Sequence, residues 1–239
     1  MNTDVNRRKF ISGAISLASL MYLPSKRALS DLQPSANSVL LVVDVQNCFL
    51  PGGTLGVPNG GDIIPVINSL GKKFENVIFT QDWHTENHAS FASSHPGKNP
   101  FETIELHYGT QVLWPDHCVQ GSKDAELAAA LDIPHAQLII RKGYHNEIDS
   151  YSTFVAADRE TKTGLTGYLK ERGLRDVYVC VLATDFCVSW SAIDARRAGL
   201  DVWVIEDACR AIDLNGSLDA AWKAMKKEGV KRIFSREIS

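Results

Sequence analysis

Cys187 lies where a predicted buried strand turns into a predicted helix, a position that suits a catalytic thiol. Residues 176–182 are apolar and β-branched without Gly or Pro, which predicts a parallel strand covered on both faces. Thr184 and Asp185 are common N-cap types, and the apolar spacing after them predicts an amphipathic helix ending at Gly199. The free N–H groups and the dipole of such a helix start favour a thiolate and can hold an oxyanion. The alternative is a small buried thiol that begins a core helix.

Two further charged residues end predicted strands. Asp44 follows the apolar run 39–43, and Lys142 ends the run 137–142, next to Gly143. An acid at the carboxyl end of a central parallel strand stands where open α/β sheets place their ligands. The alternatives are a turn cap for Asp44 and a rim lysine reaching solvent for Lys142. Because parallel strands end at one edge of a sheet, we expect both side chains to meet the thiol in one crevice.

A metal site is predicted from a carboxylate and two imidazoles. Asp82 and His84 end the second predicted strand, and His117 follows a long irregular segment rich in His, Pro, Gly, Asn and Ser. One carboxylate and two imidazoles, with other positions left to water or substrate, form an open site of the catalytic kind. His88 and Ser90 are candidate additional or outer-shell ligands, and the sequence does not choose between them. The alternative is a solvated His-rich loop.

The elements that must position these residues alternate between strand and helix. This order predicts an α/β fold with a doubly wound, mostly parallel six-stranded sheet and helices on both faces. The predicted strands cover residues 39–44, 76–81, 137–142, 176–182, 201–207 and 231–235. The predicted helices cover residues 61–74, 124–131, 165–172, the segment from 184 to 198, and 217–228.

Composition describes an ordinary globular chain. It has 239 residues, 44% hydrophobic and 22% charged, with a formal net charge of -3 and no basic stripe beyond the amino end, so nucleic acid is not expected as a partner. The cysteine count is odd and no CxxC pair occurs, which predicts free thiols rather than a disulfide scaffold. The five cysteines are Cys48, Cys118, Cys180, Cys187 and Cys209.

The amino end has the pattern of an export signal. Arg7 and Arg8 precede an apolar run at 11–23, which is too short to span a membrane comfortably, so no stable membrane anchor is expected. The paired arginines resemble a twin-arginine signal, with a cut near residues 28–30. We therefore expect residues 1–35 to be signal and linker, residues 36–239 to form one domain, and the mature protein to be periplasmic. The alternative is an exposed leader on a cytoplasmic protein.

Six stretches match one known pattern of motifs: residues 43–49, 80–84, 114–121, 141–143, 149–152 and 183–188. The run Trp-Pro-Asp-His-Cys-Val-Gln-Gly at 114–121 is the most specific of them. Together they resemble a known family, the nicotinamidases and pyrazinamidases among the isochorismatase-like cysteine hydrolases. Cys187 argues against isochorismatases proper, which lack that cysteine, and one departure is Cys48, where the family commonly has an acid. The resemblance extends from about residue 39 to the carboxyl end.

The resemblance implies the isochorismatase-like hydrolase fold and a role for each catalytic residue. It implies that Cys187 attacks a carboxamide carbon, that Asp44 moves the protons, and that Lys142 holds Asp44 and favours the thiolate. The backbone N–H groups of Ala183 and Cys187 would form the oxyanion hole, aided by a cis peptide bond between Leu182 and Ala183.

The resemblance also implies a cofactor and a substrate. Asp82, His84 and His117 would bind one divalent metal ion, with zinc first and iron or manganese as alternatives. The metal would bind the pyridine nitrogen of nicotinamide and orient its carboxamide over the thiol. The flat ring would be held by the aromatic residues Phe49 and Trp114, with Tyr151 nearby. The expected products are nicotinate and ammonia, as in pyridine nucleotide salvage, with pyrazinamide as a side substrate.

Two other functions stay open at this point. The chain could be a cysteine hydrolase for another small amide or ureide, in which case removing the metal would leave turnover intact. It could also be a metal-binding protein without activity, which would bind metal tightly and turn over no carboxamide. The sequence leaves open whether the protein forms a homo-oligomer.

Overall fold

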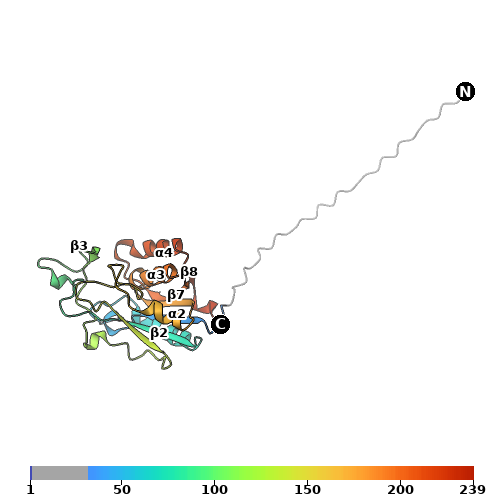
Figure 1. Ribbon diagram of the computed structural model, residues 1–239, viewed down its shortest axis with the longest axis horizontal. Helices are drawn as coiled ribbons and strands as arrows, with labels where there is room; N and C mark the ends of the chain where they lie inside the picture. Colours follow the sequence, from blue (N-terminus) through green and yellow to red (C-terminus); the bar gives the residue numbers. More distant parts are fainter. Residues whose placement is uncertain (2–31) are drawn as a thin grey trace. The chain divides into compact units, whose positions relative to one another are not determined.

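The computed structural model describes Met1 and residues 32–239 and centres on a parallel sheet of six strands (Figure 1). The sheet order is β5-β2-β1-β6-β7-β8, and every neighbouring pair is parallel. The strands are β1 (Ser38–Val43), β2 (Asn76–Asp82), β5 (Leu138–Lys142), β6 (Asp176–Leu182), β7 (Asp201–Arg210) and β8 (Lys231–Ile233). All six predicted strands are confirmed, with small shifts at their ends.

The chain reverses its direction across the sheet between β1 and β6. From β1 it moves outward to β2, whereas from β6 it moves the other way to β7 and β8. Because crossovers between parallel strands are right-handed, connections running in opposite directions cover opposite faces. The helices are α1 (Ile64–Gly71), α2 (Leu165–Glu171), α3 (Ser189–Arg197) and α4 (Ser217–Lys227), and α3 and α4 lie side by side (Figure 1). Such a reversal point is where doubly wound sheets bind their ligands.

The core explains why the central strands read as unbroken apolar runs. Every residue of β1 is buried, and β6 is buried from Val177 onward. A strand covered on both faces has no solvent side, so its sequence does not alternate.

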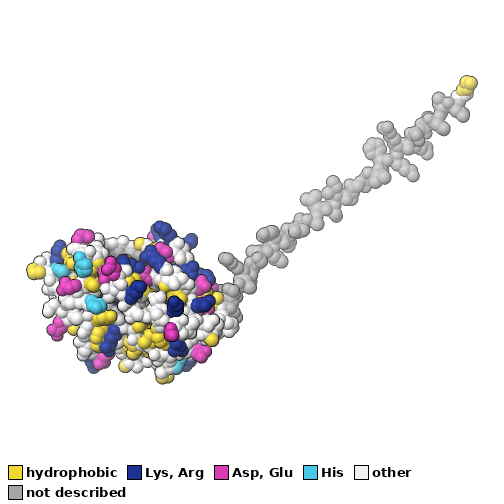
Figure 2. Space-filling model, in the orientation of Figure 1, with side chains coloured by type: hydrophobic (Ala, Val, Ile, Leu, Met, Phe, Trp, Pro, Cys, Tyr) yellow, Lys and Arg dark blue, Asp and Glu magenta, His cyan; other side chains and the backbone are white. Residues whose placement is uncertain are grey.

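On the surface shown in Figure 2, acidic and basic side chains lie among one another rather than separating by sign.

The predicted helix after Cys187 differs in its first turn. Residues Thr184–Val188 form a π-helical turn before α3 begins, and neither Thr184 nor Asp185 caps a helix. The Asp185 carboxylate instead accepts hydrogen bonds from the backbone N–H groups of Ile212 and Asp213 and from the Ser217 hydroxyl. The N-cap prediction was wrong because this carboxylate binds the loop before α4.

Two other local predictions were wrong. Residues 124–131 form no α-helix, because the segment keeps only a short 3₁₀ turn (Lys123–Ala125) and then pairs Ala128 N–H with the Val45 carbonyl. The long segment before His117 is not wholly irregular, since it contains the hairpin β3 (Thr103–Leu106) and β4 (Gly109–Val112). The predicted helix 61–74 is shorter, with a 3₁₀ turn (Gly60–Ile63) leading into α1.

The predicted leader lies almost entirely outside the described residues, so the signal, its cut and the compartment stay predictions. Among the residues that the structure describes, no helix is both long and apolar enough to cross a membrane.

Candidate active site

The thiol, the amine and the acid meet at the reversal point of the sheet. Lys142 Nζ, at the end of β5, lies 3.3 Å from Cys187 Sγ, 2.9 Å from Asp44 Oδ2 and 3.1 Å from the Ser150 carbonyl oxygen. Asp44 follows β1 and Cys187 follows β6, as strand-end placement predicts. The Asp44 carboxylate and Lys142 are buried completely or nearly so, and Cys187 is 6% exposed.

The Asp44 carboxylate is held at one oxygen and free to accept at the other. The Thr80 hydroxyl donates to Asp44 Oδ1 at 2.5 Å and accepts from the Asp44 backbone N–H. Oδ2 forms an ion pair with Lys142 Nζ, but the geometry of this contact is not that of a hydrogen bond. Oδ2 therefore accepts no hydrogen bond from the described residues. Since one carboxylate oxygen of Asp44 lies within 4.8 Å of Cys187 Sγ, this carboxylate can receive the thiol proton.

Burial dominates the electrostatics of the thiol. It raises the pKa of Cys187 well above its usual value, and the charges of Asp44 and Asp82 raise it further against the opposing effect of Lys142. Burial thus opposes the thiolate that the strand-to-helix turn is expected to favour, and the thiolate preference stays a prediction. For Lys142, burial alone would lower the pKa, but Asp44, Asp82 and Cys187 outweigh it and keep the pKa well above usual.

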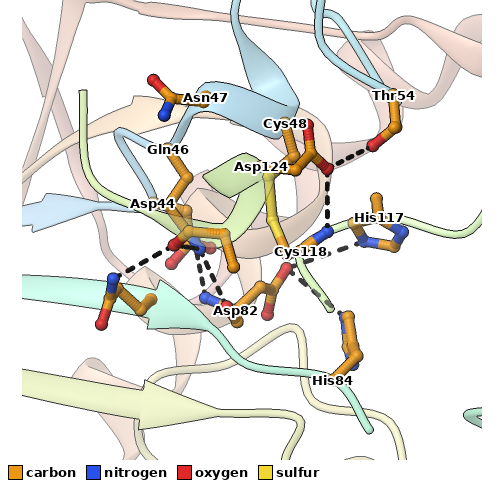
Figure 3. The surroundings of a disulfide bond; sticks show 12 residues. Asp44, Gln46, Asn47, Cys48, Thr54, Asp82, His84, His117, Cys118 and Asp124 are labelled. Atoms are coloured by element: carbon orange, nitrogen blue, oxygen red, sulfur yellow. Dashed lines mark hydrogen bonds and ion pairs between the residues drawn. A yellow bond between two sulfur atoms is a disulfide. The ribbon is translucent and has the colours of Figure 1, made fainter. Parts of the chain in front are cut away.

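Three side chains form a cradle of metal-ligand type beside the triad. Asp82 Oδ2 lies 3.8 Å from His84 Nε2 and 3.9 Å from His117 Nε2 (Figure 3). These separations are too long for hydrogen bonds, but they suit ligands placed about 2.0–2.2 Å from one shared cation. Asp82 Oδ1 also contacts Lys142 Nζ at 2.5 Å, so the cradle adjoins the triad directly. This contact was not predicted.

Backbone carbonyls orient both imidazoles toward the cradle. His84 Nδ1 donates to the Gly143 carbonyl at 2.9 Å, and His117 Nδ1 donates to the Pro115 carbonyl at 2.8 Å. Since a carbonyl only accepts, each Nδ1 carries the proton and each Nε2 presents a lone pair. Burial lowers the pKa of His84 well below its usual value and that of His117 to about 4. Both rings are therefore neutral, as metal ligands must be.

His88 and Ser90 bind each other rather than completing the cradle. His88 Nε2 donates to the His145 carbonyl at 2.9 Å, and its Nδ1 accepts from the Ser90 hydroxyl at 2.8 Å. Both ring nitrogens thus have partners, although the His88 ring lies 4.3 Å from that of His84. This geometry places the pair beside the cradle.

A small cavity of about 20 Å³ is lined both by the cradle residues and by the thiol. All three predicted aromatic residues line it. The Phe49 ring packs 5.6 Å from that of His117, and Trp114 Nε1 donates to the Tyr151 hydroxyl at 3.0 Å. The full lining is Phe49, Leu55, Asp82, His84, Trp114, His117, Asp149, Tyr151, Ala183, Phe186, Cys187 and Ile212. The structure therefore brings thiol, cradle and aromatic walls around one space.

The turn that carries the thiol has the expected backbone. The peptide bond between Leu182 and Ala183 is cis, and the Ala183 carbonyl accepts from Phe186 and Val188 N–H groups. Ala183 and Cys187 both line the cavity, and their role as an oxyanion hole stays a prediction.

Cys48 and Cys118 form a disulfide, with Cα atoms 5.7 Å apart (Figure 3). The prediction of five free thiols was therefore wrong for this pair, whereas Cys180, Cys187 and Cys209 are free and buried. The bond joins residues 70 positions apart, and spacing patterns reveal only local pairs. The two cysteines meet because Cys48, in the loop after β1, and Cys118, directly after His117, both lie beside the site.

The chain matches the family model of the Isochorismatase domain over residues 38–236, which covers the described fold. The chain belongs to the isochorismatase family. Within this family, it is 62% identical over 207 residues to the nicotinamidase of Acinetobacter baylyi, covering 87% of this chain and 97% of that relative.

Solved structures of the same family share the fold. A nicotinamidase/pyrazinamidase from Acinetobacter baumanii superposes with a TM-score of 0.84 at 62% identity, covering 85% of this chain and 98% of that one. The pyrazinamidase of Pyrococcus horikoshii, solved in complex with zinc, has a TM-score of 0.68 at 34% identity and covers 83% of this chain and 99% of that one.

Sequence reasoning missed several residues that support this site of the isochorismatase family. Thr80 reads as an ordinary β-branched strand residue, yet it binds Asp44. Gln46 donates to the Asp82 carbonyl and accepts from the Asp82 N–H, which joins the ends of β1 and β2. Asp149 lines the cavity and accepts from the Gln111 side chain. A polar residue inside a buried strand, or within three residues of its end, is the signal that could have found Thr80 and Gln46.

Proposed function

We propose that the protein is a metal-dependent nicotinamidase that hydrolyses nicotinamide to nicotinate and ammonia. One observation carries this proposal: Lys142 Nζ contacts Asp44, Asp82 and Cys187, so the catalytic triad directly adjoins the metal cradle. A thiol with an acid partner suits amide cleavage, and a cation beside it suits positioning of a ring nitrogen. The similarity to nicotinamidases over most of the chain supports the substrate.

Acylation begins with the protonated thiol. As Sγ of Cys187 bonds to the carboxamide carbon, its proton passes to the Asp44 carboxylate. The negative charge that develops on the carbonyl oxygen is held by the N–H groups of Ala183 and Cys187. Lys142 remains charged, because its pKa is held well above usual, and it stabilises both the carboxylate and the developing negative charge.

Collapse of the tetrahedral intermediate breaks the C–N bond. The proton on Asp44 moves to the leaving nitrogen, which departs as ammonia and leaves a thioester on Cys187. Water then enters, gives a proton to Asp44, and its oxygen bonds to the acyl carbon. The C–S bond breaks, the proton returns to Sγ, and the carboxylic acid product is released.

The residues of the cradle fit a divalent cation. Two neutral imidazoles with free Nε2 lone pairs face one carboxylate oxygen, the donor set that zinc, iron or manganese accepts. When bound, such an ion would hold the ring nitrogen of the substrate and so fix the carboxamide over the thiol. Zinc in the pyrazinamidase of Pyrococcus horikoshii supports zinc as the first choice. Pyrazinamide, which keeps a nitrogen in the ring, is the expected second substrate.

The aromatic walls hold the flat ring. Phe49 approaches from the loop after β1, and Trp114 is fixed by its hydrogen bond to Tyr151.

Ammonia release from nicotinamide tests the proposal. We expect release by wild type, none by Cys187→Ala, and loss on metal removal that zinc restores. Equal release by both proteins would refute the nucleophile assignment. Full activity after metal removal would favour a hydrolase of another small amide.

We also propose that the enzyme is exported. The twin-arginine pattern at Arg7 and Arg8 supports this, and so does the Cys48–Cys118 disulfide, since such bonds persist in oxidising compartments. Cell fractionation of wild type and an Arg7→Lys, Arg8→Lys variant is the test. Wild type should be periplasmic and the variant retained in the cytoplasm.

A further inference from the structure

The Cys48–Cys118 disulfide joins two segments that supply different parts of the site. We propose that this bond positions the metal cradle against the substrate wall, so that the oxidised protein binds metal and substrate more tightly than the reduced protein. The inference rests on the proposed function of the site and adds a redox requirement to it.

On one side, the bond reaches both histidines of the cradle. Cys118 directly follows His117, and its carbonyl accepts the backbone N–H of His84 at 3.1 Å. Its backbone is left-handed, with φ at 47°, so the chain turns sharply just after the ligand. The buried Cys118 therefore accepts a hydrogen bond from the backbone of His84 and is joined to His117 by a peptide bond.

On the other side, the bond reaches the aromatic wall. Cys48 directly precedes Phe49, and its carbonyl accepts the backbone N–H of Leu55 at 2.9 Å. Phe49 and Leu55 both line the cavity, and the Phe49 ring packs on His117. The disulfide thus spans the two sides between which a ring would lie.

Hydrogen bonds also join these segments. Gln46 Nε2 and Asn47 N–H donate to the carbonyls of Ala125 and Glu126, at the end of the short 3₁₀ turn. Close to the cradle, Asp124 Oδ2 accepts from the Thr54 hydroxyl and from Cys118 N–H (Figure 3).

The Thr54–Asp124 bond is exposed to water, whereas both cysteines are fully buried. Since solvent competes for exposed hydrogen bonds, the disulfide is the firmer link at this end.

The redox step is ordinary thiol–disulfide exchange. The two thiols lose two protons and two electrons to an external disulfide, which leaves as two thiols. A phosphine reverses the step: the S–S bond breaks, the two sulfurs take up two electrons and two protons, and the phosphine becomes its oxide with oxygen from water.

The test compares wild type with Cys48→Ala, Cys118→Ala and the double variant. Cys180→Ala is the matched control, because it also removes a buried sulfur but lies inside β6, away from the cavity. Zinc affinity is measured by competition with a coloured chelator, and kcat and KM are measured with nicotinamide. Wild type reduced with a phosphine also lacks the disulfide. It therefore tests the same change if a cysteine variant fails to fold.

We expect each single variant, the double variant and reduced wild type to lose about tenfold or more in zinc affinity, the range seen for residues that support metal ligands. KM should rise more than kcat falls. The single and double variants should match, since either change breaks the same bond, and oxidised glutathione should restore reduced wild type. Cys180→Ala should keep wild-type affinity.

Unchanged zinc affinity on reduction, additive losses in the double variant, or an equal loss in Cys180→Ala would each overturn the inference. Zinc affinity needs no turnover, so this outcome is independent of the substrate. If oxidised wild type binds zinc but releases no ammonia from nicotinamide, the proposed function fails. The positioning role of the disulfide is then decided by the zinc affinities of the oxidised and reduced proteins alone.

Discussion

Gly143→Ala should weaken metal binding by displacing His84. Gly143 has φ at +65°, and its carbonyl accepts from His84 Nδ1. An added Cβ would lie 2.5 Å from Cε1 and 2.8 Å from Nδ1 of His84. Because carbon contacts need about 3.5 Å, the ring must shift by roughly 1 Å. Metal–ligand distances tolerate only about 0.2 Å, so the cradle should lose its geometry.

The chain offers a matched control for the backbone cost. Gly173, after α2, has φ at +69°, and an added Cβ there meets no heavy atom within 4 Å. Alanine at either position bears the left-handed backbone cost, about 1–2 kcal/mol. Only Gly143→Ala should also lose zinc affinity, by about 10- to 100-fold, which is about 1.4–2.7 kcal/mol.

Two measurements separate these effects. Thermal unfolding of apo Gly173→Ala gives the backbone cost alone, and chelator competition at a fixed pH gives the zinc affinity of each variant. Zinc affinity within twofold of wild type in Gly143→Ala, or an equal loss in Gly173→Ala, would refute the role given to this contact.

Three further predictions concern the triad, the cradle and the wall. Thr80→Val should lower kcat roughly 10- to 100-fold, because it leaves the buried Asp44 Oδ1 without its hydrogen-bond donor, which costs about 1–3 kcal/mol. Thr80→Ser keeps the hydroxyl and should retain activity. Wild-type kcat in the valine variant would contradict this role. Burial raises the pKa of Asp82 to about 8, so a proton competes with the cation for this carboxyl. Zinc affinity should weaken as pH falls below 8, and calorimetry in buffers of different ionisation enthalpy should find proton release that Asp82→Asn lacks. Tyr151→Phe leaves the buried Trp114 N–H without its partner and should raise KM several-fold with a smaller change in kcat, and an unchanged KM would count against the wall.

Much of the fold and site could be predicted because the determining signals are strong. Strands buried on both faces read as unbroken apolar runs, and charged or reactive residues at their carboxyl ends must share one edge. This reasoning brought Asp44, Lys142 and Cys187 together, and the structure places both Asp44 and Cys187 in contact with Lys142 Nζ.

The remainder depends on tertiary contacts that local patterns do not encode. Each strand of the hairpin β3–β4 has only four residues, so the alternation in Thr103–Leu106 is too brief to mark a strand. Cys48 and Cys118 are 70 residues apart, and only the folded sheet edge brings them together. The direction of the Cys187 pKa follows from how deeply the sulfur is buried and from Asp82 nearby, neither of which a strand-to-helix turn reveals.

Mapping the acyl group on the enzyme tests the central claim most directly. Enzyme incubated with nicotinamide is quenched in acid, digested and analysed by mass spectrometry, with Cys209→Ala as a control that removes a buried free thiol outside the cavity lining. We predict a nicotinoyl thioester on the peptide that carries Cys187, in wild type and in Cys209→Ala alike. An acyl group on another residue, or ammonia release that persists in Cys187→Ala, would contradict the account.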